Sequence, residues 1–206
     1  MLRLFDSLLS GNCWKVRILL NQLGTPFERV TLDLLKGEAG TAQFRQKSRF
    51  ARVPVLELED GRTIVESGAI LIYLAQGTRY LPEDPYLRAE VTSWLFFEQG
   101  DIQKSIAQCR VHHLRGHARS IPNEIERLHA EGYAGLEKLD SWLAGRDWLV
   151  SDKYTVADLA LFPYVSLSRE GGFVLERFSA VRQWLSRVED QPGWINLWHG
   201  RAPPLA

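Results

Sequence analysis

Residues 53–68 of this 206-residue chain read VPVLELEDGRTIVESG, and they decide the fold of its first half. Pro54 stands where the apolar strand that follows should begin. Proline lacks a backbone N–H and restricts the residue before it, so the Val53-Pro54 junction favours a turn, with a cis peptide bond as one form of it. Such a turn leaves the backbone N–H and C=O of Val53 to pair with an extended ligand.

The same stretch ends at Glu66 and Ser67, where we expect a helix over residues 66–75 to begin. The positive end of a helix attracts an anion. The carboxylate of Glu66 can accept hydrogen bonds from an ammonium group. Together with Val53, these two residues describe a pocket for a small zwitterionic peptide.

Composition excludes several classes of function. Hydrophobic residues make up 45% of the chain and charged residues 24%, which is ordinary for a globular protein with a full core. The formal net charge is zero, so neither nucleic acid nor an anionic membrane surface is indicated as a partner. No apolar run approaches the roughly 20 residues that a membrane helix needs. Arg3 and Asp6 interrupt the layout of a secretory signal.

The cysteines indicate a protein of a reducing compartment, and the histidines do not indicate a metal centre. Cys13 and Cys109 cannot build a disulfide framework, so we expect a cytoplasmic protein. The five histidines are scattered, and the helical pair His113 and His117 has no third ligand within sequence reach. We therefore expect no metal site.

The first eighty residues alternate strand and helix signals. The apolar alternation and the Asp60-Gly61 hairpin signal predict strands, and the three- and four-residue spacing of Val16, Leu19, Leu20 and Leu23 predicts a helix. The expected order is strand 2–4, helix from 12 or 13 to 23, strand 27–32, a short helix 38–46, strands 55–58 and 62–65, and helix 66–75. This β-α-β-α-β-β-α order is an α/β domain whose first two strands run parallel.

A linker and an all-helical half follow. Two prolines and an acidic pair in residues 80–85, YLPEDP, mark the linker. Helical spacing then predicts helices over 86–115, 125–143, 159–165 and 179–189. Thr155-Val156-Ala157-Asp158 is a capping signature before an unusually apolar helix, which we expect in the middle of its domain. The expected division is residues 1–80, a linker 81–86, and a helical domain 87–206.

Five motifs in this order resemble the cytosolic glutathione S-transferase family, in a serine-type, theta-like or related bacterial form, over nearly the full chain. The motifs are Ser10-Gly11-Asn12-Cys13, Val53-Pro54, Glu66-Ser67, the prolyl linker and Thr155-Val156-Ala157-Asp158. The resemblance implies a thioredoxin-like N-terminal domain that binds glutathione, a helical C-terminal domain that carries the second substrate, and a homodimer. Glutathione is then a cosubstrate, and no other cofactor is expected.

Ser10-Gly11-Asn12-Cys13 stands where redox proteins of the thioredoxin type have Cys-x-x-Cys. The attacking cysteine is replaced by Ser10, so dithiol redox chemistry is excluded at this turn. The Ser10 hydroxyl can donate to the sulfur of a bound thiol instead, and Asn12 is the rival for that role. Ser10 also fits a simple helix cap. Cys13 fits a small buried apolar residue, or a partner in a mixed disulfide with glutathione.

The remaining contacts are implied by the resemblance. Val53 would bind the cysteinyl backbone, with Pro54 as the cis residue that shapes the turn. Glu66 and Ser67 would hold the γ-glutamyl ammonium and carboxylate, and Ser67 also fits a helix cap. For the glycyl carboxylate the candidates are Lys36, Gln43 and Arg52, and we favour Arg52.

The electrophile is expected to meet the helical domain at Ile106, Arg110, His113 and Phe162, although aromatic residues at helical spacing also fit a core. Asp158 resembles a buried helix-capping acid and is assigned to folding. The leading function is a glutathione transferase that acts on a small electrophile. The alternatives are a glutathione-dependent peroxidase or disulfide-bond reductase, with Asn12 prominent, and a non-catalytic binding protein with this fold.

Overall fold

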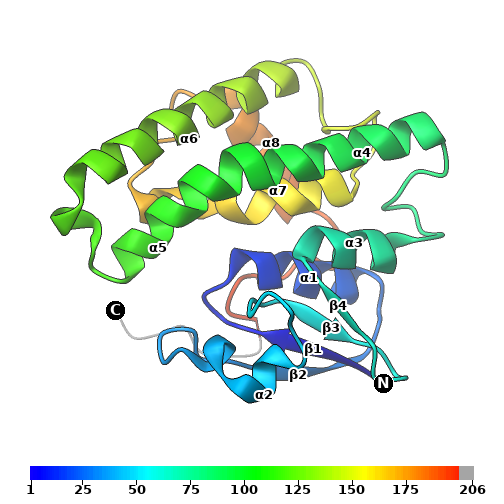
Figure 1. Cartoon of the computed structure of the whole chain (residues 1–206). Coiled ribbons are helices and arrows are strands. Elements are labelled where there is room, and N and C mark those ends of the chain that lie inside the picture. The colour runs from blue at the N-terminus through cyan, green and yellow to red at the C-terminus, as the bar shows by residue number, and fades with distance from the viewer. Residues whose placement is uncertain (200–206) are drawn as a thin grey trace. The chain divides into compact units, whose positions relative to one another are not determined.

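A computed structural model describes residues 1–199 as two compact units (Figure 1). Unit 1 contains Met1–Gln76 together with the segment that begins at Gln191, and unit 2 contains Gly77–Asp190. Within the described residues, no helix is long and apolar enough to cross a membrane.

Unit 1 is built on a four-stranded mixed sheet. The strands are β1 Leu2–Asp6, β2 Phe27–Thr31, β3 Val55–Glu57 and β4 Thr63–Val65, in the order β2-β1-β3-β4. β1 and β2 are parallel, and the other two pairs are antiparallel. Because parallel neighbours need a crossover, α1 (Gly11–Gln22) connects the first two strands. The expected βαβαββα order is confirmed.

The two faces of the sheet are covered unequally. α1 and α3 (Ser67–Ala75) pack on one face, where Ile70 of α3 meets Leu4 and Leu56 of the strands. Among residues 1–199, the helical elements on the other face are the three-residue 3₁₀ turn η1 (Glu38–Gly40) and the single turn α2 (Ala42–Arg45). Its core consists of Phe5, Leu32, Phe44, Val55 and Val65.

Unit 2 contains only helices among the described residues. They are α4 Pro85–Phe97, η2 Glu98–Ala107, α5 Gln108–Leu114, η3 Ala118–Ser120, α6 Pro122–Leu143, α7 Val156–Ser166, η4 Ser168–Gly171 and α8 Ser179–Glu189. The long helix expected over 86–115 is present as α4, η2 and α5 in succession, but η2 is π-helical. Within η2 the Ser105 hydroxyl donates to the carbonyl of Asp101, four residues earlier, a contact that distorts helices.

α7 occupies the middle of unit 2. Its Thr155 cap and Asp158 form the predicted capping box. Residues 156–165 are all buried, as expected for a helix that is apolar on every side. Phe162 packs edge-on against Trp184 of α8, with ring centroids 6.5 Å apart.

The chain returns to unit 1 after α8, which differs from the expected division at residues 81–86 and 87–206. Residues 191–199 lie with unit 1 because side chains of α1 and β2 bind their backbone. Trp14 Nε1 donates to the carbonyl of Ile195 at 2.7 Å, for example. Such contacts join residues about 180 positions apart, so no local pattern announces them.

Candidate functional site

Strand pairing brings the separate motifs of the first half to one edge of the sheet. Val55 of β3 stands opposite Val65 of β4 and opposite Phe5 of β1. One residue further along, Pro54 therefore adjoins both Glu66 and Asp6. The turn after β1, the Val53-Pro54 loop and the start of α3 meet at this edge. We call this set, residues 7–13, 52–54 and 66–67, the clamp edge.

The Val53-Pro54 peptide bond is cis, which is one of the two forms expected from the sequence. The loop before it is held by Ser48, a buried residue. The Ser48 hydroxyl donates to the carbonyl of Arg52 at 2.9 Å and accepts from its backbone N–H at 3.1 Å. The Arg52 side chain is exposed. Sequence reasoning missed Ser48 because a single serine seven residues before a strand carries no motif.

Glu66 and Ser67 begin α3 with an unusual backbone. Glu66 is the N-cap residue and has φ of 71°, in a region that costs a non-glycine residue about 1–3 kcal/mol. Its exposed side chain makes no capping bond. Ser67 is the first helical residue and is buried, so the N-cap position is Glu66 and not Ser67. A strained cap with an exposed carboxylate is typical of a ligand-binding position.

Ser67 also contacts the turn that carries the candidate thiol-binding residues. Its hydroxyl donates to Oδ1 of Asn12 at 3.2 Å. This bond joins the N-termini of α1 and α3, although 55 residues separate the two side chains. Because Oδ1 is turned toward Ser67, the orientation of the Asn12 amide is set.

Ser10 caps α1, as the sequence allowed. Its side-chain oxygen accepts from the backbone N–H of Cys13 at 3.2 Å, and its own N–H donates to the carbonyl of Ser7 at 3.1 Å. The capping contact uses Ser10 Oγ as an acceptor, so the hydroxyl hydrogen can be donated elsewhere. Capping and donation to a ligand sulfur are therefore compatible.

The two cysteines are poor nucleophiles in this structure. Burial raises the pKa of the Cys13 thiol well above its ordinary value, and the nearby Asp6 carboxylate raises it further. Burial also raises the pKa of Cys109. Cys13 is fully buried, which fits the small apolar residue expected at this position. Any thiolate chemistry at the clamp edge therefore needs a sulfur supplied by a ligand.

The four residues expected at the electrophile site lie in different surroundings within unit 2. Ile106 and Phe162 are fully buried. Arg110 is buried and pairs with Glu170, Nε to Oε2, at 2.7 Å. His113 has an exposed ring, whose Nδ1 lies 2.9 Å from the carbonyl of Cys109. The electrophile site stays a prediction. Of the four residues, His113 is the one with an exposed side chain.

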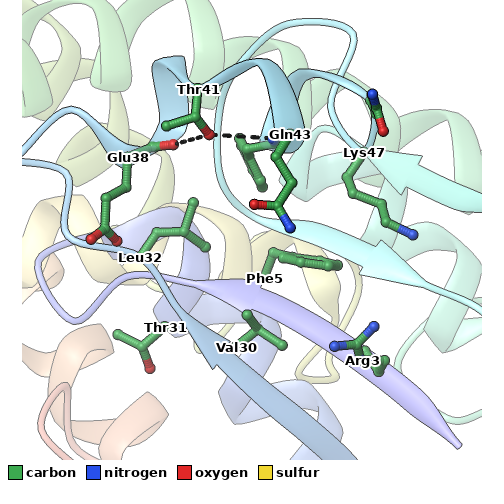
Figure 2. Close-up of a pocket in the computed structure, with 11 residues that line it drawn as sticks. Arg3, Phe5, Val30, Thr31, Leu32, Glu38, Thr41, Gln43 and Lys47 are labelled. Carbon is green, nitrogen blue, oxygen red and sulfur yellow. Dashed lines mark hydrogen bonds between the residues drawn. The ribbon is translucent and has the colours of Figure 1, made fainter.

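A cavity of about 490 Å³ opens on the α2 face of unit 1 (Figure 2). Phe5 of β1, Val30 of β2 and Leu32, the residue after β2, form its lower wall, and Gln43 and Lys47 approach from above. Residues of η1 and α2, among them Glu38 and Phe44, also line it. None of the seven residues predicted to contact glutathione lines it, although Gln43 was one candidate for the glycyl carboxylate.

No metal is suggested by the side chains. Within residues 1–199, no group of three or more His, Cys, Asp or Glu side chains is arranged to hold a metal ion.

Comparisons with known proteins agree with this architecture. Residues 4–79 match the family model described as glutathione S-transferase, N-terminal domain, and residues 119–192 match glutathione S-transferase, C-terminal domain. The crystal structure of glutathione S-transferase from Pseudomonas fluorescens is similar with a TM-score of 0.93 at 38% identity, over 95% of this chain and 98% of that one. Ure2p in complex with glutathione gives 0.86 at 29% identity, over 93% and 95%. Disulfide-bond oxidoreductase YfcG from Escherichia coli (strain K12) is 29% identical over 189 residues, 88% of this chain and 87% of that protein.

Proposed function

Because the chain belongs to the glutathione S-transferase family, we propose that it binds glutathione along the clamp edge and activates the thiol for attack on a small electrophile. The observation that carries this proposal is the bond from Ser67 to Asn12 at 3.2 Å. It joins the start of α3, where a peptide anion would bind, to the turn where a sulfur would lie.

The clamp edge offers complementary groups to each part of the peptide. The exposed Glu66 carboxylate would accept from the γ-glutamyl ammonium, while the backbone N–H groups of Ser67 and the first turn of α3 would bind the γ-glutamyl carboxylate. The backbone N–H and C=O of Val53 would pair with the cysteinyl backbone, because the cis bond to Pro54 places Val53 in the turn just before β3. Arg52 would face the glycyl carboxylate.

Thiol activation needs a modest free energy. An unperturbed thiol has a pKa of about 8.5, so only a few per cent is ionised at neutral pH. Lowering this pKa by about two units requires about 2.7 kcal/mol of preferential thiolate stabilisation. One hydrogen bond from Ser10 to the anion and the N-terminal end of α1 together supply about that amount.

The proposed reaction proceeds by displacement or addition. The thiol proton leaves to solvent, and the thiolate sulfur forms a bond to the electrophilic carbon. In a displacement, the bond to the leaving group breaks, and the leaving group departs with its electron pair. In an addition, the π bond at the attacked carbon breaks, and the atom that receives its electron pair takes a proton from solvent. Cys13 takes no part, because it is buried and protonated.

A second candidate is a glutathione-dependent disulfide-bond reductase. Two observations favour it: the fixed Asn12 amide, which can donate to a sulfur, and the similarity to the disulfide-bond oxidoreductase of E. coli. In this reaction one glutathione thiolate attacks a disulfide sulfur and releases the first thiol. A second glutathione then releases the other thiol and leaves as glutathione disulfide, so that two glutathiones are oxidised for each disulfide reduced.

One experiment separates these proposals. The purified protein is titrated with glutathione, and then assayed with a chloronitroarene, a peroxide and a small disulfide. Ser10→Ala and Asn12→Ala are compared with wild type. We expect Ser10→Ala to lose about tenfold or more of the chloronitroarene rate, and Asn12→Ala to affect disulfide reduction more.

The outcomes are distinct. Absence of glutathione binding by the wild type would overturn both enzyme proposals and leave the non-catalytic binding protein. Full chloronitroarene activity in Ser10→Ala would overturn the role given to Ser10. We further propose that the protein is a homodimer and that it acts in the cytoplasm. Sedimentation equilibrium tests the dimer, and localisation of the tagged protein tests the compartment.

A further inference from the structure

The segment Gly193–His199, which we call the strap, is bound to unit 1 through its backbone. The carbonyls of alternate residues accept from side chains of α1 and β2. The contacts are Asn21 Nδ2 to Gly193 at 2.9 Å, Trp14 Nε1 to Ile195 at 2.7 Å, Arg17 Nη1 to Leu197 at 2.8 Å and Arg29 Nη1 to His199 at 3.2 Å. Four consecutive odd-numbered carbonyls directed at one surface indicate a specific docking mode.

The strap is also packed closely. Ile195 and Leu197 are buried, and the Trp194 ring meets Trp14 edge-on with centroids 6.2 Å apart. Gly193 has φ of 77°, and a Cβ there would lie 3.1 Å from Cα of Gln22. Only glycine allows this backbone so near α1 without strain.

α1 uses two faces for two different tasks. Val16 and Leu20 pack into the core of the sheet. Trp14, Arg17 and Asn21 are spaced by three and four residues, so they lie on one side of the helix, and all three bind the strap. Trp14 lies in the first turn of α1, two residues after Asn12.

A buried charge cluster extends this contact to the end of β1. Asp6, the last residue of β1, is fully buried and lies between Arg29 of β2, which donates to its Oδ2, and Arg17 of α1, whose Nε is 3.5 Å from Oδ1. Burial lowers the pKa of Arg17, and the Asp6 carboxylate raises it. Both arginines also hold strap carbonyls. The two ends of the β1–α1 turn, Asp6 and the start of α1, are thus fixed through groups that the strap covers.

We propose that the strap positions the β1–α1 turn, and that Trp14, Arg17 and Arg29 are positioning residues for the sulfur of glutathione. This inference rests on the proposed binding of glutathione at the clamp edge. Loss of the strap admits water to the Asp6 cluster and removes the acceptor that holds Trp14. The first turn of α1, with Ser10 and Asn12, then has fewer restraints.

Trp14→Phe tests this, since it keeps a six-membered aromatic ring and removes the indole N–H together with the rest of the five-membered ring. Trp142→Phe is the matched control, because Trp142 Nε1 likewise donates to a backbone carbonyl, that of Leu149, at 3.0 Å in unit 2. Leu197→Asp is a stronger release of the strap. Hydrogen exchange of the amides at positions 7–14, measured without glutathione, reports the turn directly.

We expect faster exchange at positions 7–14, by about tenfold or more, in Trp14→Phe and Leu197→Asp, and unchanged exchange there in Trp142→Phe. The Kd for glutathione should rise about three- to tenfold in Trp14→Phe. A double-mutant cycle should show that Trp14→Phe and Asn12→Ala are coupled in glutathione binding, whereas Trp142→Phe and Asn12→Ala are additive.

Unchanged exchange in Trp14→Phe would overturn the inference whatever the protein binds. So would faster exchange with an unchanged glutathione Kd, because the strap would then stabilise the turn without serving the site. If the wild type binds no glutathione, the proposed function fails, and the role in positioning glutathione fails with it. The exchange data then show separately whether the strap holds the turn. If Leu197→Asp does not fold, Trp14→Phe decides.

Discussion

The Asp158 carboxylate accepts several hydrogen bonds within unit 2, and its substitution tests how burial and hydrogen bonding compete there. Its carboxylate is fully buried at the start of α7. It accepts from the backbone N–H groups of Leu149 at 3.0 Å and Thr155 at 2.9 Å, and from Nε1 of Trp184 at 3.0 Å. Three N–H donors from three segments of unit 2 therefore depend on one side chain, and the Thr155 hydroxyl donates to it as well, at 3.3 Å.

Asp158→Asn keeps the size of the side chain and changes its hydrogen bonding. The amide oxygen can retain at most two of the three donors, and the new NH₂ group faces an N–H. A buried donor left without an acceptor costs about 1–3 kcal/mol. We expect Asp158→Asn to lose about 2–4 kcal/mol of unfolding free energy at pH 7, a large share of the roughly 5–15 kcal/mol that keeps a domain folded.

The loss should depend on pH, with a sign set by burial. Burial raises the pKa of Asp158 from 3.8 to about 6, against the opposing effect of its hydrogen bonds. Between these values the folded protein keeps a proton that the unfolded chain has lost. This contribution to stability is present at low pH and is lost as the pH rises through 6. The gap between wild type and Asp158→Asn should be about 2 kcal/mol wider at pH 4.5 than at pH 7.

Urea unfolding followed by tryptophan fluorescence at both pH values measures the gap. Asp140→Asn is the matched control, because Asp140 accepts one backbone N–H, that of Val181, at 2.9 Å in the same unit. We expect the control to lose about 1 kcal/mol. A gap that is equal at the two pH values, or wider at pH 7, would refute the argument, because the hydrogen bonds to the carboxylate would then outweigh its burial.

Three further predictions concern single substitutions. Ser67→Ala removes the hydrogen bond that holds the α1 turn against the start of α3, so the glutathione Kd measured by calorimetry should rise about tenfold; an unchanged Kd would count against the clamp edge. Gly132→Ala places a Cβ 2.5 Å from Cε1 of Phe173 and should cost about 1–3 kcal/mol in thermal unfolding, more than Gly135→Ala, whose Cβ meets its nearest atom at 3.3 Å. Cys13→Ala should keep glutathione-dependent activity, and a lost activity would instead favour a mixed disulfide.

The parts of the fold that were predictable are those set by neighbours in sequence. The Asp60-Gly61 turn and the alternation of apolar and polar residues on both sides of it predict the hairpin. The register of that hairpin then places Pro54 next to Glu66. The Thr155 cap and the apolar helix after it were equally plain. That apolar pattern also implied a buried Phe162, which fits the core position found in unit 2 better than a pocket wall.

The remaining features depend on contacts between distant residues. Arg17 and Leu197 are 180 residues apart. The sequence of α1 places an arginine beside apolar residues but does not indicate which carbonyl it binds. The π-helical stretch over Glu98–Ala107 differs from an α-helix by one residue in its hydrogen bonds, while the apolar spacing is almost the same. Ser48 holds the loop before Pro54 through a hydrogen bond to the carbonyl of Arg52, which depends on how the loop folds. None of these features alters composition or periodicity, so a single sequence does not show them.

The return of the chain to unit 1 makes the helical unit an insertion in architectural terms. The backbone leaves unit 1 after Gln76 and re-enters it at Gln191, so unit 1 is assembled from two separate segments. A fragment that ends near residue 80 therefore lacks the residues that bury Arg17 and Asp6. A single proteolytic cut in residues 77–84 also leaves the two units joined through residue 190. Exchange of the helical unit between related proteins consequently needs two junctions, one at each crossing.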